Sequence, residues 1–248
     1  MSRFLSLSAI LALAVLASLS LMAAPAKSEP PQGTPQDTAQ GRQLAELFTS
    51  QGCSSCPPAE ALFARLAQDP DLVTIEWHVD YWDQLRYGGS RWQDPFSSPD
   101  FTARQRAYNK ALRGTASVYT PQAILGGKAE FVGSRAGDMK AARARAAAPS
   151  LRLATCPGSL SVSGEGRGDV YFVRLLTQHE TNVRGGENKG RQLKGRNVAL
   201  GMEKLGQYSG TPDNYALPVL KPGESCALFV QEPGHGAILG ATYCPAYP

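Results

Sequence analysis

The sequence lacks a strong charge of either sign, which bears on the partners it can have. Its 25 Lys and Arg residues and 21 Asp and Glu residues leave a formal net charge of +4 on 248 residues. The basic residues are spread along the chain, and a group of them at 135–145 alternates with alanine, as on the solvated face of a helix. Nucleic-acid-binding proteins concentrate such charge in one patch. We therefore expect no nucleic-acid partner.

Long apolar runs are also scarce. The one run of this kind, at residues 4–21, follows Arg3 and precedes a small-x-small sequence at 24–26. This pattern is typical of a signal peptide with its cleavage site, so we predict a signal peptide at 1–26 and a periplasmic or secreted protein. The run is close to the ~20 residues that span a bilayer, which leaves an uncleaved anchor as the alternative. Beyond this signal we expect no membrane contact.

The chain also lacks an internal repeat, a second Cys-x-x-Cys and a Walker motif. A structural zinc site needs four ligands, and one Cys-x-x-Cys does not provide them. The glycine-rich segment at 185–191 has neither the Walker spacing nor a following helix, so a β-turn is expected there. We predict no cofactor and no bound metal.

The most informative motif that is present is Cys-Ser-Ser-Cys, with cysteines at Cys53 and Cys56. It follows a strand-like run at 44–49 and precedes a helix-like run that begins with two prolines at 57–58. The first turn of a helix offers free N–H groups and the positive end of the dipole, which stabilise a thiolate. We predict that Cys53 is the nucleophile and that Cys56 resolves the mixed disulfide.

The elements around this motif are expected to follow the order strand, helix, strand, helix, hairpin, helix. Their expected bounds are 44–49, 57–68, 72–79, 102–112, 118–132 and 138–148. This order is that of a thioredoxin-like fold, so we predict an α/β protein with a thioredoxin-like domain at 42–149. The Pro-, Gln- and Gly-rich segment at 27–41 is expected to be a disordered spacer.

From about residue 150 the pattern changes to short β-like runs separated by Gly, Pro and Asn. We predict a small antiparallel β domain at 150–248. Three of the five cysteines fall in this part, at Cys156, Cys226 and Cys244. A hairpin turn at 232–236 would bring Cys226 opposite Cys244, which predicts a structural disulfide. Cys156 would then be free, paired between chains, or exchanging with the other two.

Candidate substrate-binding residues are expected near the motif. Thr120-Pro121 opens the hairpin where thioredoxin-like folds carry a cis-proline, although a trans bond is the commoner state of any X-Pro. Polar and aromatic residues follow the second strand, where ligands gather in open α/β sheets, but they could equally form a packed loop. The predicted substrate-binding residues are Thr120, Pro121, Gln122, His78, Asp80 and Trp82. Glu46, in the strand before the motif, could be a buried base or could face water or an arginine.

Six segments together resemble a known family. They read ELFTSQGCSSCPPA (46–59), HVDYWD (78–83), DPF (94–96), RQRAY (104–108), VYTPQ (118–122) and GENKGR (186–191). The chain is similar in these segments to the DUF1223 family, which are secreted bacterial proteins with a thioredoxin-like domain. The resemblance implies that fold and export, and it implies no substrate.

We therefore predict an exported thiol–disulfide oxidoreductase that acts on protein or small-molecule thiols and disulfides. One alternative is a soft-metal protein in which Cys53, Cys56 and His78 bind copper. A second alternative is a non-catalytic binding scaffold, because fold does not dictate function. The direction of exchange stays open, because Ser-Ser between the cysteines differs from the dipeptides of better-known relatives.

Overall fold

The computed structural model describes residues 41–245. The signal peptide predicted at 1–26 and all but the last residue of the spacer predicted at 27–41 lie outside the described residues. The described residues belong to one compact unit. None of the helices within 41–245 combines the length and the apolar character that a bilayer span requires.

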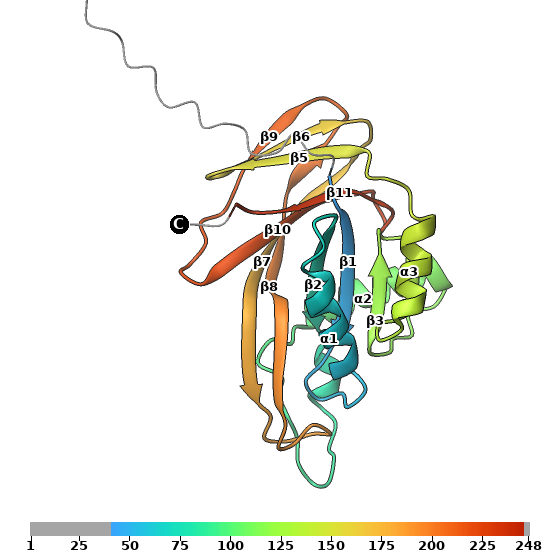
Figure 1. The fold of residues 1–248 in the computed structure, drawn as a ribbon, viewed down its shortest axis with the longest axis vertical. Helices are drawn as coiled ribbons and strands as arrows, with labels where there is room; N and C mark the ends of the chain where they lie inside the picture. Colours follow the sequence, from blue (N-terminus) through green and yellow to red (C-terminus); the bar gives the residue numbers. More distant parts are fainter. Residues whose placement is uncertain (1–40, 246–248) are drawn as a thin grey trace, which may run out of the picture. The chain divides into compact units, whose positions relative to one another are not determined.

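A mixed eight-stranded sheet dominates this unit (Figure 1), with strand order β11-β10-β7-β8-β2-β1-β3-β4. Its strands are β1 (Gln43–Thr49), β2 (Leu72–His78), β3 (Gln122–Leu125), β4 (Ala129–Val132), β7 (Gly168–Asn182), β8 (Gln192–Tyr208), β10 (Glu224–Gln231) and β11 (Ile238–Tyr243). A second sheet has the order β5-β6-β9, with β5 (Leu151–Cys156), β6 (Ser159–Gly164) and β9 (Asp213–Ala216). The chain is therefore an α/β protein with a large sheet and few helices.

The helices begin and end where local chemistry dictates. Their bounds are α1 (Pro57–Leu66), the short 3-10 helix η1 (Asp80–Trp82), α2 (Pro99–Arg113) and α3 (Ala136–Arg145). Both α1 and α2 carry proline in the first turn, where a missing N–H costs nothing. Ser98 caps α2 by accepting a hydrogen bond from the Asp100 N–H, and Gly114 ends that helix with a φ of 71°.

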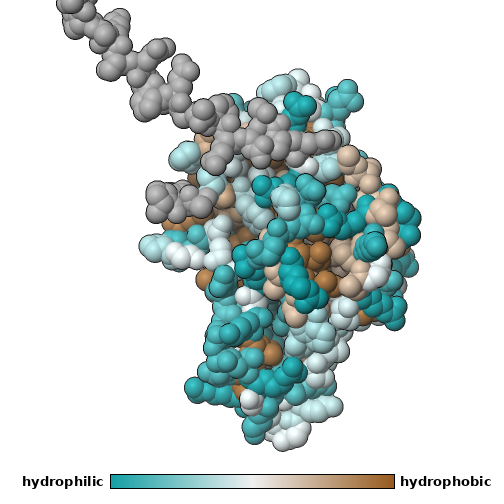
Figure 2. All heavy atoms as spheres, viewed as in Figure 1, coloured by the Kyte–Doolittle hydropathy of each residue, from teal (hydrophilic) through white to brown (hydrophobic). Residues whose placement is uncertain are grey.

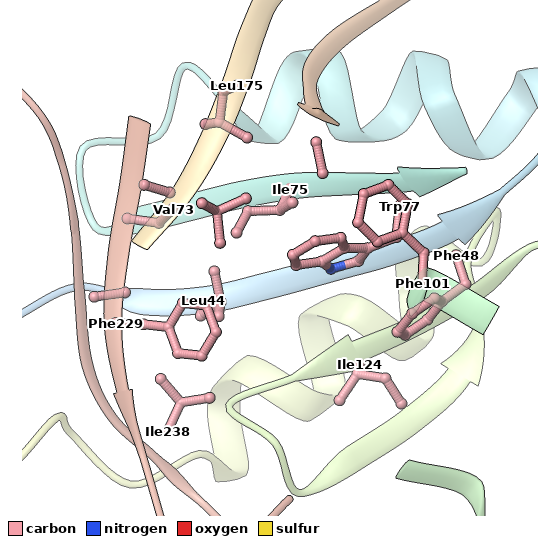
Figure 3. Close-up of a cluster of buried hydrophobic side chains, with 14 of the residues drawn as sticks. Leu44, Phe48, Val73, Ile75, Trp77, Phe101, Ile124, Leu175, Phe229 and Ile238 are labelled. Atoms are coloured by element: carbon pink, nitrogen blue, oxygen red, sulfur yellow. The ribbon is translucent and has the colours of Figure 1, made fainter. Parts of the chain in front are cut away.

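Alternation along the central strands separates two cores. On one face, residues of β1 and β2 such as Leu44 and Trp77 pack with Phe101 of α2 (Figure 3). On the other face, Leu47 and its neighbours pack with Phe63 of α1 and with α3. Burial of both faces explains why β2 is buried along its whole length.

The strands after residue 150 differ from the expected separate β domain. Only β5, β6 and β9 form a sheet of their own, whereas β7, β8, β10 and β11 extend the sheet that contains β1 and β2. Phe229 of β10 and Leu175 of β7 belong to the same core as Ile75 (Figure 3). The boundary expected between 149 and 150 therefore cuts through the large sheet and this core, although the β5-β6-β9 sheet and a second core around Leu160 and Phe172 lie wholly beyond it. The cause is the pairing of Glu76 in β2 with Val198 in β8, which makes β2 an inner strand.

A buried ion pair lies in the core on the α2 side. The Glu46 carboxylate accepts hydrogen bonds from Arg104 Nε at 2.7 Å and Trp77 Nε1 at 3.0 Å through Oε1, and from the Tyr108 hydroxyl at 2.5 Å through Oε2. The side chains of Glu46 and Arg104 are 0% and 3% exposed. Glu46 faces α2 rather than the helix that follows the cysteines, so it anchors α2 and is not placed as a base for the motif.

The remaining cysteines lie far from the motif in sequence. Cys226 of β10 and Cys244, just beyond β11, form a disulfide, and the Cys244 N–H also donates to the Cys226 carbonyl at 2.9 Å. Cys156, at the end of β5, is exposed and forms no disulfide within residues 41–245.

On the face drawn in Figure 2, hydrophilic residues predominate and hydrophobic ones lie in small groups.

Candidate functional site

The Cys53–Cys56 disulfide occupies the turn between β1 and α1. The Cys53 N–H donates to the Ser50 carbonyl at 3.1 Å, the Cys56 N–H donates to the Cys53 carbonyl at 3.2 Å, and Cys56 immediately precedes the helix. Both cysteines are fully buried, although the two serines between them are exposed. The disulfide is thus covered by protein at the point where the chain turns into α1.

The start of α1 differs in one respect from the helix N-terminus that the motif predicts. Its first two residues, Pro57 and Pro58, have no N–H groups, so the thiolate of a reduced Cys53 has fewer backbone donors nearby. The Ser55 hydroxyl lies 3.3 Å from Cys53 Sγ and can donate to that thiolate. The helix dipole and this hydroxyl remain as stabilising groups.

We expect Ser55→Ala to raise the pKa of Cys53 in the reduced protein, because the thiolate loses the hydrogen bond that the Ser55 hydroxyl can donate. The pKa is measured from the pH dependence of the rate of Cys53 alkylation. The exposed neighbour Ser54, whose hydroxyl has no described contact with sulfur, supplies the control variant Ser54→Ala. Equal pKa values in the two variants would contradict the assignment of Ser55.

The turn between β7 and β8 holds the motif from the side. The amide of Asn188 donates to the carbonyls of Gln51 and Cys53, both at 2.9 Å, and the Glu187 carboxylate accepts from the Ser54 N–H at 2.8 Å. Asn188 is fully buried, and its own carbonyl accepts from Arg191 at 2.8 Å. The sequence predicts a simple β-turn here. It did not predict that this turn is hydrogen-bonded to the loop that carries the cysteines. The available signal was the GENKGR segment.

Of the predicted residues, Trp82 lies next to Gly52, which precedes Cys53, and Trp82 is hydrogen-bonded to Thr120. The Thr120–Pro121 peptide bond is cis. Trp82 Nε1 donates to Thr120 Oγ1 at 2.8 Å, and the Trp82 Cβ lies 3.2 Å from where a Cβ on Gly52 would stand. A small cleft runs beside them, lined by Gly52, Trp82, Leu85, Tyr87, Trp92, Gly186 and Glu187.

The predicted residues Gln122 and Asp80 are engaged elsewhere. The buried amide of Gln122 donates to Asn109 at 2.6 Å and to Glu130 at 3.0 Å, so it fixes α2 against β3. The Asp80 carboxylate accepts from Thr102 at 2.6 Å and ties η1 to α2. The Gln122 amide and the Asp80 carboxylate both form hydrogen bonds that hold α2 in place. Neither group is therefore directed to a docked substrate.

His78 is buried and linked to the motif through one intermediate residue. Its Nδ1 lies 2.7 Å from Asp94 Oδ2, and the same oxygen accepts from the Gln51 N–H at 2.7 Å. Burial lowers the pKa of His78, but the Asp94 carboxylate, together with the charges of Glu60 and Asp83, raises it, and the net pKa is raised. Burial raises the pKa of Asp94, but His78 and the hydrogen bonds lower it overall. His78 therefore supports the cysteine loop from within and does not face a substrate.

Three further ionisable residues lie around His78, and the sequence reasoning missed them. Burial raises the pKa of Glu60 in α1, whose Oε1 accepts from Thr49 at 2.7 Å. Burial, and then the charge of Glu60, raise the pKa of Glu76 well above its usual value. Burial and the neighbouring His78 lower the pKa of His179 to about 4. Glu60 in α1 and Glu76 in β2 are buried, and His179 in β7 is half-buried.

The copper set expected as an alternative is not assembled. Cys53 and Cys56 form a disulfide with each other, and His78 Nδ1 is paired with the Asp94 carboxylate. The group of His, Cys, Asp and Glu side chains that could hold a metal within the described residues contains Glu76, His78 and His179, and no cysteine.

Two solved structures are similar to this chain. The crystal structure of a protein from Agrobacterium tumefaciens is 27% identical, with a TM-score of 0.68, and the match covers 84% of this chain and 96% of that one. The protein HBP35 of Porphyromonas gingivalis is 14% identical with a TM-score of 0.51, covering 84% of this chain and 76% of that one, and supports the fold alone. No curated protein matches the chain.

A family model described as "protein of unknown function (DUF1223)" matches residues 44–231. The match includes the cysteine motif, β2, the cis-proline and the turn that holds the motif. It also spans the residue at which a domain boundary was expected, in agreement with the continuous sheet. The chain therefore belongs to the DUF1223 family.

Proposed function

We propose that this protein is a thiol–disulfide oxidoreductase that uses Cys53 and Cys56 on protein or small-molecule thiols and disulfides. The observation that carries the proposal is the disulfide at the junction of β1 and α1, together with the cis Thr120–Pro121 bond just before β3, the strand that pairs with β1. Trp82 lies between the two segments: it donates to Thr120, and its Cβ would be 3.2 Å from a Cβ on Gly52. A disulfide with a purely structural role does not require a neighbouring tryptophan and cis-proline.

We also propose that the residues up to α3 form a thioredoxin-like unit to which the later strands have been added. In support, β1 pairs in parallel with β2 and antiparallel with β3, and β3 pairs with β4. The helix α1 joins the first two of these strands, and the chain from β1 to α3 keeps the order expected of this fold.

The exchange proceeds in two balanced steps. In the reducing direction, the Cys53 thiolate attacks one sulfur of a partner disulfide, the partner's S–S bond breaks, and the other partner sulfur leaves as a thiolate. Cys56, as its thiolate, then attacks Cys53 Sγ and releases the second partner thiol. The partner gains two electrons and the protein is left with the Cys53–Cys56 disulfide. The oxidising direction is the reverse.

The cleft beside Gly52 is the proposed docking place for the partner. Its rim carries Leu85 and Tyr87, which are 49% and 58% exposed, and apolar or aromatic rims of this kind suit an extended peptide. Because Cys53 itself is buried, the Glu187 and Asn188 contacts must loosen before a partner sulfur reaches it. The turn at 183–191 is thus proposed as a cover over the disulfide.

An oxidising compartment fits this function. The signal peptide predicted at 1–26 would export the chain, and the two disulfides within residues 41–245 are of the kind that persists outside the cytoplasm. We therefore propose a periplasmic or secreted protein.

The proposal is tested by trapping the mixed disulfide. In a Cys156→Ser background, which removes the exposed thiol, the further change Cys56→Ser should leave Cys53 bound to one glutathione after treatment with oxidised glutathione. Intact-mass and peptide mass spectrometry identify the adduct, and the matched variant Cys53→Ser should accumulate far less of it on Cys56. Absence of the adduct on Cys53 would refute the proposal and leave a non-catalytic scaffold.

Loosening the cover should speed reduction. We expect Glu187→Ala to increase the rate at which dithiothreitol reduces the Cys53–Cys56 disulfide by about 3- to 10-fold, the value of one hydrogen bond to the Ser54 N–H. The rate is followed by quenched alkylation and mass spectrometry. Lys189→Ala changes an exposed side chain of the same turn and serves as the control. A rate equal to that of the control would show that the turn does not limit access.

A further inference from the structure

Glu76, His78 and His179 come together although they belong to separate parts of the sheet. Glu76 and His78 lie two residues apart on β2, and His179 lies on β7, with β8 between the two strands. One potential ligand atom from each residue lies within 4.8 Å of the other two. The rings of His78 and His179 are 5.9 Å apart between centroids, and both contact Phe96.

Each of the three residues has one buried side-chain atom without a partner, and the other Glu76 oxygen, Oε2, accepts from the Arg196 N–H at 3.3 Å. Glu76 Oε1, His78 Nε2 and His179 Nε2 form no hydrogen bond within residues 41–245. Glu76 and His78 are 0% and 1% exposed, so water does not compensate them at the surface. A buried polar atom without a partner destabilises the fold, and three residues with such atoms in one cluster point to a ligand that they share.

Gly195 makes the convergence possible. It pairs with His179 in the β7–β8 ladder, and a Cβ at this position would stand 2.2 Å from His179 Nε2 and 2.8 Å from Glu76 Oε2. Only glycine therefore lets the imidazole of His179 cross β8 and approach the Glu76 carboxylate.

The other ring nitrogens are held as they are in metal sites. His78 Nδ1 lies 2.7 Å from the Asp94 carboxylate, which leaves Nε2 directed to the cluster. His179 Nδ1 lies 3.4 Å from the hydroxyl of Thr181. A histidine that binds metal through one nitrogen commonly donates from the other to a carboxylate or similar acceptor, which fixes the ring.

A path to solvent also exists. A pocket of about 440 Å³ opens beside the cluster and includes His179 and Gly195 in its wall. Ala64 of α1 and Arg196 of β8 form other parts of the wall. An ion can enter through this pocket, and an external ligand can approach the ion from it.

From these observations we propose that Glu76, His78 and His179 bind a divalent transition-metal ion. Two imidazoles and one carboxylate are a donor set typical of zinc and of non-haem iron(II). Ligand atoms about 2.1 Å from a tetrahedral ion lie about 3.4 Å apart, so the side chains need to close by at most about 1.4 Å. With three protein ligands, the ion keeps a position for water or a small molecule from the pocket.

The test uses Zn²⁺ as the probe and the tag-free protein with Cys53–Cys56 oxidised and Cys156 changed to serine, so that no thiolate competes. Calorimetric titration is expected to give one Zn²⁺ per chain. Co²⁺ should give visible absorption of a low-symmetry site, and Zn²⁺ should displace it. Weak binding at several equivalents, or no binding, would overturn the proposal.

Variants then assign the site. The nearest atoms that Gly195→Ala meets are side-chain ends, those of His179 and Glu76, and not backbone, so it should fold, yet it should lower Zn²⁺ affinity at least about 10-fold, as should Asp94→Asn. His235→Gln alters the other described histidine, which contacts Tyr108 away from the cluster, and should leave affinity unchanged. Circular dichroism checks folding, and Zn²⁺ should raise the melting temperature of the parent but not of Gly195→Ala. Equal affinity in Gly195→Ala and His235→Gln would overturn the site.

Discussion

Replacing Cys53 with serine should lower the rate of disulfide exchange with glutathione to that of the uncatalysed reaction, a loss of roughly 100-fold or more. The serine hydroxyl is not ionised at neutral pH and cannot form the mixed disulfide. The rate is measured by following the reduction of a peptide disulfide by reduced glutathione at fixed protein concentration, with Cys156→Ser as the parent.

Two further variants make this result specific. Ser54→Ala changes the exposed neighbour of the nucleophile and should exchange at the parental rate. Cys56→Ser keeps the attacking sulfur, so it should form the first mixed disulfide but turn over slowly. If Cys53→Ser retained the parental rate, the exchange would have to be assigned to another cysteine and the proposed mechanism would be wrong.

Replacing Arg104 with methionine should lower the free energy of unfolding by about 3 to 5 kcal/mol, which is the effect of leaving a buried charge without its partner. Arg104 is the cation of the core ion pair, and its Nε lies 2.7 Å from a Glu46 carboxylate that is 0% exposed. Its guanidinium also stacks against Trp77, Tyr108 and Phe229, which a methionine side chain can partly replace. Urea unfolding of the oxidised protein, followed by tryptophan fluorescence, measures the change.

The double variant separates the charge from the packing. Glu46→Gln removes the uncompensated charge while keeping an oxygen that can accept from Trp77 Nε1. Glu46→Gln combined with Arg104→Met should therefore be more stable than Arg104→Met alone. If the double variant were less stable by the sum of both single changes, the loss would come from packing and not from the unpaired charge.

The sequence predicts the first half of the fold better than the second, for a physical reason. Between β1 and α3 the elements follow the order of a known fold, and helix periodicity, Gly-Gly and proline mark each element. The later segments have a clear β pattern, but their local sequence does not predict which strand each of them pairs with. The pairing of Val198 with Glu76, which places β8 beside β2, connects residues too far apart for any local pattern.

The same distinction applies to the candidate site. The cysteines, Trp82 and Thr120 could be recognised because a motif and its neighbouring elements carry them. Asn188 reaches the Cys53 carbonyl across a separation of 135 residues, and His179 reaches its cluster across β8. Gln122 was expected at the substrate because it follows Pro121, but the alternation of β3 turns its amide toward Asn109.

The reduction potential of the Cys53–Cys56 pair tests the central claim most directly. The protein is equilibrated with glutathione or dithiothreitol buffers of known potential, quenched with an alkylating agent, and analysed by mass spectrometry at these two cysteines. We predict a reversible two-electron transition between about −270 and −120 mV, the range of Cys-x-x-Cys oxidoreductases. A potential below about −300 mV, as in structural disulfides, would contradict the account.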